Sequence, residues 1–146
     1  MKHTAHFFRS MVAATALTFV SVAAHAATVN LKATLKASSE VPAKDSAGTG
    51  MLTATLDTTT NEFKYHIVYS GLTGAATAAH FHGPAAEGVN AGPQVPIKGG
   101  VASPIDGSAT LTADQAKDLL DGKWYFNVHT AANPGGEIRG QVMKGK

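Results

Sequence analysis

The sequence predicts an all-β domain, either an antiparallel β-sandwich or a small Greek-key barrel, that carries one short helix. Apolar and polar residues alternate over several short segments, which is the period of a strand with one buried face. Clusters of Gly, Pro, Asn and Asp separate these segments and predict turns between the strands. A single capping signal, late in the chain, predicts the helix.

The strand patterns place large apolar side chains at every second position. Three segments show this most clearly, and we expect their apolar faces to build the core: Val29, Leu31, Ala33 and Leu35 in 28–36; Phe63, Tyr65, Ile67 and Tyr69 in 62–70; and Trp124, Phe126 and Val128 in 123–130. Further strands are predicted at 51–57, 75–82, 94–98, 108–111 and 137–143. Pro93 lies just before the segment 94–98 and Pro96 lies within it, which favours an edge strand there.

The helix is predicted over residues 113–121. Thr112 has the position of an N-cap residue, and Gln115 follows it at the spacing of a capping box. Gly122 suits the residue after the last turn, because glycine adopts the left-handed backbone conformation found there.

The first 26 residues resemble a signal peptide, so we do not expect them to be part of the folded domain. Lys2 and Arg9 give a positive start, an apolar run follows, and Ala24 and Ala26 are small residues at the positions that a signal peptidase reads. The apolar run is too short to span a membrane, which takes about 20 residues. We therefore expect a periplasmic or secreted domain, residues 27–146, with no membrane insertion after cleavage.

Charge and cysteine content exclude several classes of function. The chain has 12 basic and 10 acidic residues, so removal of Lys2 and Arg9 leaves ten of each and no net charge. Such a domain lacks the basic surface that nucleic-acid binding needs. The absence of cysteine excludes disulfides and thiolate metal sites, and it favours a bacterial envelope over animal secretion.

Three motifs in fixed order carry a family resemblance. They are Glu40-Val41-Pro42, residues 80–85 (HFHGPA), and residues 125–130 (YFNVHT) leading into 133–141 (NPGGEIRGQ). Together they resemble the CHRD (chordin-type) domain family over residues 31–142. The sequence departs from the family pattern at 43–44, where many members have a second proline and an apolar residue, and at Phe81, which is often isoleucine.

The resemblance implies an all-β module outside the cytoplasm, of a kind named from repeats in the animal signalling antagonist chordin and common in bacterial secreted proteins. It implies no established reaction, so the function has to be argued from the side chains themselves.

The histidines are the candidate functional residues. On a strand, His80 and His82 point to the same face about 6.7 Å apart at the backbone, while two ligands of one zinc ion lie roughly 3.4 Å apart. A small inward lean of each ring would therefore bring both onto one metal. His129 lies on the polar face of its strand and is the expected third ligand, and His66 is a possible fourth. An all-imidazole set without cysteine suits copper or zinc.

Other readings of these histidines remain open. They could have a purely structural role in a protein-interaction or envelope-structural module whose loops bind an envelope or extracellular protein. A copper-dependent redox enzyme such as a superoxide dismutase is a third hypothesis, since His80 and His82 are loosely similar to the His-X-His pair of those enzymes. Such an enzyme needs an open coordination position and a route for turnover, neither of which a sequence can show, and our expectation leans towards a non-enzymatic role.

The neighbours of the histidines are expected to have supporting roles. Tyr125 and Asn127 share a strand face with His129, so they either orient it or pack across the strands. Glu137 and Arg139 share a face of the last strand, and the sequence predicts an ion pair there.

Overall fold

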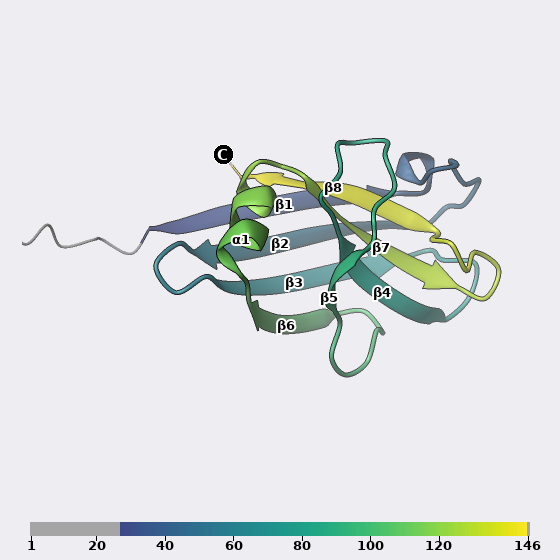
Figure 1. Ribbon diagram of the computed structural model, residues 1–146. Helices are drawn as coiled ribbons and strands as arrows, with labels where there is room; N and C mark the ends of the chain where they lie inside the picture. The colour runs from purple at the N-terminus through teal and green to yellow at the C-terminus, as the bar shows by residue number, and fades with distance from the viewer. Residues whose placement is uncertain (1–26, 146) are drawn as a thin grey trace, which may run out of the picture.

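The computed structural model describes residues 27–145, which form one curled, eight-stranded antiparallel sheet and one α-helix (Figure 1). The elements in chain order are β1 (Thr28–Lys36), the 3₁₀ turn η1 (Ala37–Ser39), β2 (Thr49–Asp57), β3 (Glu62–Ser70), β4 (Ala76–His82), β5 (Pro93–Pro96), β6 (Ile105–Thr110), α1 (Ala113–Leu120), β7 (Trp124–Thr130) and β8 (Ile138–Lys144). Every predicted strand is present, with ends displaced by at most three residues. The predicted signal peptide, residues 1–26, lies outside the described residues.

The strands follow the order β5-β4-β7-β8-β1-β2-β3-β6, and all neighbours pair antiparallel. The sheet curls so far that β3 and β4, which are separated by four strands within it, face each other. The rings of Phe63 on β3 and Phe81 on β4 are 5.0 Å apart. This nearly closed architecture confirms the predicted all-β fold with one short helix, and β5 lies at one edge as the flanking prolines indicated.

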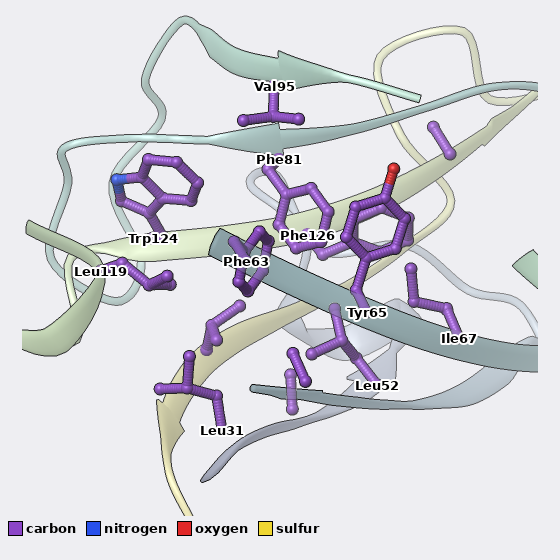
Figure 2. Packing of buried hydrophobic residues seen from close by; sticks show 14 of the residues in the cluster. Leu31, Leu52, Phe63, Tyr65, Ile67, Phe81, Val95, Leu119, Trp124 and Phe126 are labelled. Atoms are coloured by element: carbon purple, nitrogen blue, oxygen red, sulfur yellow. The ribbon is translucent and has the colours of Figure 1, made fainter. Parts of the chain in front are cut away.

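Aromatic side chains fill the space between the two halves of the sheet (Figure 2). Phe81 is central: its ring lies within 6.2 Å, centroid to centroid, of four other aromatic rings, those of Phe63, Tyr65, Trp124 and Phe126. The period-two prediction for the core is therefore confirmed, except that Val29 and Tyr69 are only partly buried and pack at the margin.

Helix α1 begins at the predicted capping box. The Gln115 amide nitrogen donates to Thr112 Oγ1 over 3.2 Å, and the Thr112 amide donates to Gln115 Oε1 over 3.0 Å. The helix buries Ala116 and Leu119 and ends one residue earlier than predicted, ahead of Gly122 with φ of 71°. Among residues 27–145, no helix has both the length and the apolar character needed to cross a membrane.

Strand β7 is buried on both faces, although its alternating sequence predicted one polar face. The inward face packs on the core, and the connection between β4 and β5 covers the outward face (Figure 1). The Ala85 amide donates to Lys123 O over 2.8 Å and the Ala91 amide donates to the Tyr125 hydroxyl over 3.1 Å. A loop rich in Ala and Gly thus shelters the side chains that project outward from β7.

Candidate metal centre

Strand alternation brings three histidines to one outward face. On β4, Phe81 points into the core, so His80 and His82 on either side of it point outward. On β7, Phe126 and Val128 point inward, which leaves His129 on the outward face. The β4–β7 register pairs Ala78 with His129, and the three imidazoles therefore converge across two neighbouring strands.

The three imidazoles are already close enough to share an ion. One ring nitrogen from each of His80, His82 and His129 can be chosen so that all three lie within 4.8 Å of one another. His80 Nδ1 lies 3.2 Å from His129 Nε2, which is close to the ~3.4 Å between two ligands of one zinc ion. Small ring movements would complete a three-nitrogen site.

Backbone carbonyls hold the His82 and His129 rings in place, each through a hydrogen bond to the Nδ1 atom of the ring. His82 Nδ1 lies 2.9 Å from Ala91 O, and His129 Nδ1 lies 2.9 Å from Pro134 O. A carbonyl only accepts, so each Nδ1 carries the hydrogen and each Nε2 keeps its lone pair. Metal-binding histidines are usually held in this way, with the second N–H donated to a carbonyl or carboxylate.

The Nε2 atom of His82 is buried, and no group of the described residues forms a hydrogen bond with it. Burial lowers the pKa of both His80 and His82, and the neighbouring histidines lower it further. The hydrogen bond to Ala91 opposes part of this shift at His82. Both rings are consequently neutral at neutral pH, which is the state that binds a metal.

An aromatic stack supports His82 from its other side. The Tyr125 ring lies parallel to the His82 ring, with centroids 4.8 Å apart and planes at 3°. The Arg139 guanidinium carbon lies 3.4 Å from the centroid of the Tyr125 ring. Arg139 is 2% exposed and donates to Asn90 Oδ1 and Val89 O, so it ties the covering loop to the stack.

The predicted ion pair between Glu137 and Arg139 is wrong, since each residue has other partners. Glu137 is fully buried and accepts hydrogen bonds at 2.6–2.8 Å from Ser46, Thr73 and Thr130. Burial on its own would raise the pKa of Glu137, but these hydrogen bonds outweigh it and lower the pKa to about 2. Glu137 thus joins three segments of chain, those of Ser46, Thr73 and Thr130.

The structure does not bring His66 to the other three histidines, which corrects its assignment as a possible fourth ligand. Its neighbours Tyr65 and Ile67 are buried in the core, so His66 projects from the outer surface of β3. There its Nδ1 lies 2.7 Å from Asp106 Oδ1. The core therefore lies between His66 and the outward face of β4 and β7.

One buried acidic residue beside this face was not predicted. Glu40 follows η1 and is 5% exposed, and its Oε1 lies near Asn127 Nδ2, since both atoms are within 2.7 Å of the position that a methyl group on Gly136 would take. Its only sequence signal is the Glu40-Val41-Pro42 motif, which carries the family resemblance but indicates no chemistry. For Asn127 the sequence predicts either orientation of His129 or packing across the strands.

One of three comparisons with known proteins found a match, and it identifies a family. A family model described as the CHRD domain matches residues 31–142, a range that includes the three clustered histidines. No curated protein and no solved structure matches the chain.

Proposed function

Since the chain belongs to the CHRD domain family, and the family fixes no reaction, we propose from the side chains that it binds one copper or zinc ion. The ligands are His80, His82 and His129. Copper(II) and zinc(II) suit an imidazole set, and the chain has no cysteine that would favour a thiolate site. The role is sequestration, delivery or sensing of the ion.

The observation that carries this proposal is the buried, unpaired Nε2 of His82. Among residues 27–145 it has no hydrogen-bond partner, and a ring nitrogen of His82 lies within 4.8 Å of a ring nitrogen on each of the other two histidines. Leaving a buried acceptor unpaired costs roughly 1–3 kcal/mol. In a purely structural histidine nothing would offset this free-energy cost, whereas in a metal ligand the binding of the ion would offset it.

The compartment is part of the proposal. We propose that the protein acts in the periplasm or outside the cell, because residues 1–26 have the pattern of a signal peptide. Sequencing the N-terminus of the protein purified from its producing cells tests this, and the expected first residue is Ala27. An intact start at Met1 would contradict it.

Calorimetric titration of Cu(II) and Zn(II) into protein freed of metal by chelation tests the metal site. We expect binding of one ion tighter than about 1 μM, equivalent to about 8 kcal/mol, and its loss in His80→Ala/His82→Ala. The matched control is His66→Ala, which removes a histidine from the opposite surface. Weak binding, or binding that the double substitution leaves unchanged, would favour the protein-interaction module instead.

A copper redox activity is a separate outcome of the same preparation. Three protein ligands leave a fourth position on a four-coordinate ion, which catalysis requires. Superoxide consumption by the copper-loaded protein, absent from the zinc-loaded protein, would assign an enzyme.

A further inference from the structure

Asn127 lies at the centre of the outward face that carries the three histidines. It is paired directly with His80 across β4 and β7, and it precedes His129 by two residues on the same face. Only 3% of Asn127 is exposed. Its Oδ1 atom is buried, and no described residue donates a hydrogen bond to it. A buried amide oxygen normally accepts a hydrogen bond, so a donor outside the described residues is expected here.

The Glu40 carboxyl determines which end of the Asn127 amide faces the histidines. Glu40 Oε1 and Asn127 Nδ2 both lie within 2.7 Å of the position that a methyl group on Gly136 would take, so the carboxyl and the amide nitrogen are neighbours. Burial, the largest effect, raises the pKa of Glu40, and Arg139 and Asn127 oppose that rise. A carboxylate accepts, so the Asn127 Nδ2 group must face Glu40. The opposite end, Oδ1, is then directed away from Glu40.

The other end of the amide lies on the face that the three histidines share, because Asn127 pairs with His80 across the strands while Tyr125, two residues earlier on the same face, pairs with His82. Neither His82 Nε2 nor Asn127 Oδ1 has a hydrogen-bond partner among residues 27–145. This face thus carries two buried acceptors without a partner, and a metal ion alone would satisfy only the histidine.

Gly136 makes room for this arrangement. A methyl group at this position would overlap Glu40 Oε1 and would lie 2.7 Å from Asn127 Nδ2. The φ of Gly136 is +123°, which other residues rarely adopt. The turn after β7 is therefore shaped to let the acid and the amide meet.

We propose that Asn127 Oδ1 accepts a hydrogen bond from a small O–H ligand, such as water, at the fourth coordination position of the bound ion. Glu40 holds the amide in the required orientation, so Glu40 and Asn127 are positioning residues and not metal ligands. This inference rests on the proposed metal site, because three histidines leave one position of a tetrahedral ion free. It makes the site selective for ligands that carry a hydrogen.

The selectivity gives a direct test with azide, an anion without hydrogen. In the copper-loaded protein, azide must displace a water that Asn127 stabilises. Loss of a single hydrogen bond should tighten azide binding by roughly three- to tenfold. Azide dissociation constants are measured from the azide-to-copper absorption band and from the copper electron paramagnetic resonance spectrum.

Four variants separate the acceptor from a general structural role. Asn127→Leu removes the oxygen and should tighten azide binding, while Asn127→Asp retains an oxygen and should not. Glu40→Gln should shift azide affinity in the same direction as Asn127→Leu, by a smaller factor, and it reports on the site if Asn127→Leu fails to fold. Gln141→Leu is the matched control, since Gln141 also has a buried, unpaired oxygen but pairs with Tyr125 instead.

The two proposals fail in different ways. Wild-type protein that takes up no metal overturns the proposed function, and the ligand inference with it. Wild type and Asn127→Leu that both bind one copper ion, with equal affinity for azide, overturn the ligand inference alone. Tighter azide binding in Gln141→Leu as well would also overturn it, because the effect would then not depend on the Asn127 oxygen.

Discussion

The Nδ1 atom of His80 and the Nε2 atom of His129 lie 3.2 Å apart across two neighbouring strands. His129 donates its other N–H to Pro134 O, so its Nε2 must accept. Without metal, the hydrogen between the two rings therefore comes from His80. This contact holds the rings at ligand spacing, and in the proposed site a metal ion would take the place of one hydrogen.

A preformed site predicts that metal stabilises the fold. At a free Zn(II) concentration about 100 times the dissociation constant, linkage adds about 2.7 kcal/mol to the free energy of unfolding. For a domain of this size the melting temperature should rise by about 10 °C. Thermal unfolding followed by circular dichroism, with and without Zn(II), measures the rise, and His129→Ala should abolish it. Equal melting temperatures in wild type would contradict the metal site.

The His66→Ala variant should leave the affinity for metal unchanged. His66 and Asp106 form a pair on the outer surface of β3 and β6, with about half or more of each side chain exposed. Such pairs contribute less than about 1 kcal/mol. Calorimetry of the variant with Zn(II) should give the wild-type dissociation constant, while a weakened affinity would mean that His66 reaches the ion.

The contrast between His66 and His129 shows how far the sequence determines the site. Alternation along a strand indicates that both histidines face away from the core. It does not indicate which strands become neighbours, and only the curling of the sheet separates the two outward faces. His80 and His82 were predictable as a pair because two positions on one strand share a face whatever the topology.

Burial of β7 depends on a loop that leaves no periodic signal. Residues 83–92 are mostly Gly, Ala and other small residues, as expected for a loop, and their path over Tyr125 depends on hydrogen bonds to Arg139 and Lys123. The same long-range packing brings Glu40 close to Asn127. The core, the strands and the helix could be predicted from local patterns, whereas the residues around the histidines depend on contacts between distant segments.

Glu137 should make the free energy of unfolding depend on pH. Its folded pKa of about 2 is lower than its ordinary value of 4.5. A lowered pKa contributes stability that is complete above about pH 5 and lost as the pH falls through the folded value. The loss should approach about 3 kcal/mol. Urea denaturation between about pH 6 and pH 2 should show a steeper decline for wild type than for Glu137→Gln, and parallel profiles would contradict this.

Phe81 should couple the core to the metal centre. It lies between His80 and His82 in the chain and contacts four aromatic rings inside the sheet. Phe81→Ala should reduce the free energy of unfolding by roughly 3–5 kcal/mol, and Phe81→Leu by roughly 1 kcal/mol. Because the backbone of both ligands is then less firmly held, Phe81→Leu should also weaken Zn(II) binding. Unfolding and calorimetry of the same samples check both effects.

The adjacent glycines Gly135 and Gly136 allow a closely matched comparison. At Gly136 an added methyl group meets Glu40 and Asn127 and must also adopt a φ of +123°, whereas at Gly135 nothing lies within 4 Å. Gly136→Ala should therefore lower the free energy of unfolding by more than about 1 kcal/mol, and Gly135→Ala by less. Denaturation of both variants measures the difference.

The same pair of variants also tests whether this turn orients His129. Pro134, whose carbonyl accepts from His129 Nδ1, lies in the turn with both glycines. Displacement of the turn by Gly136→Ala should release that ring and weaken Zn(II) binding, because a freed imidazole must be ordered again when the ion binds. Gly135→Ala should bind Zn(II) as wild type does. If both variants bind Zn(II) equally well while Gly136→Ala is destabilised, the Pro134 carbonyl does not govern the ligand.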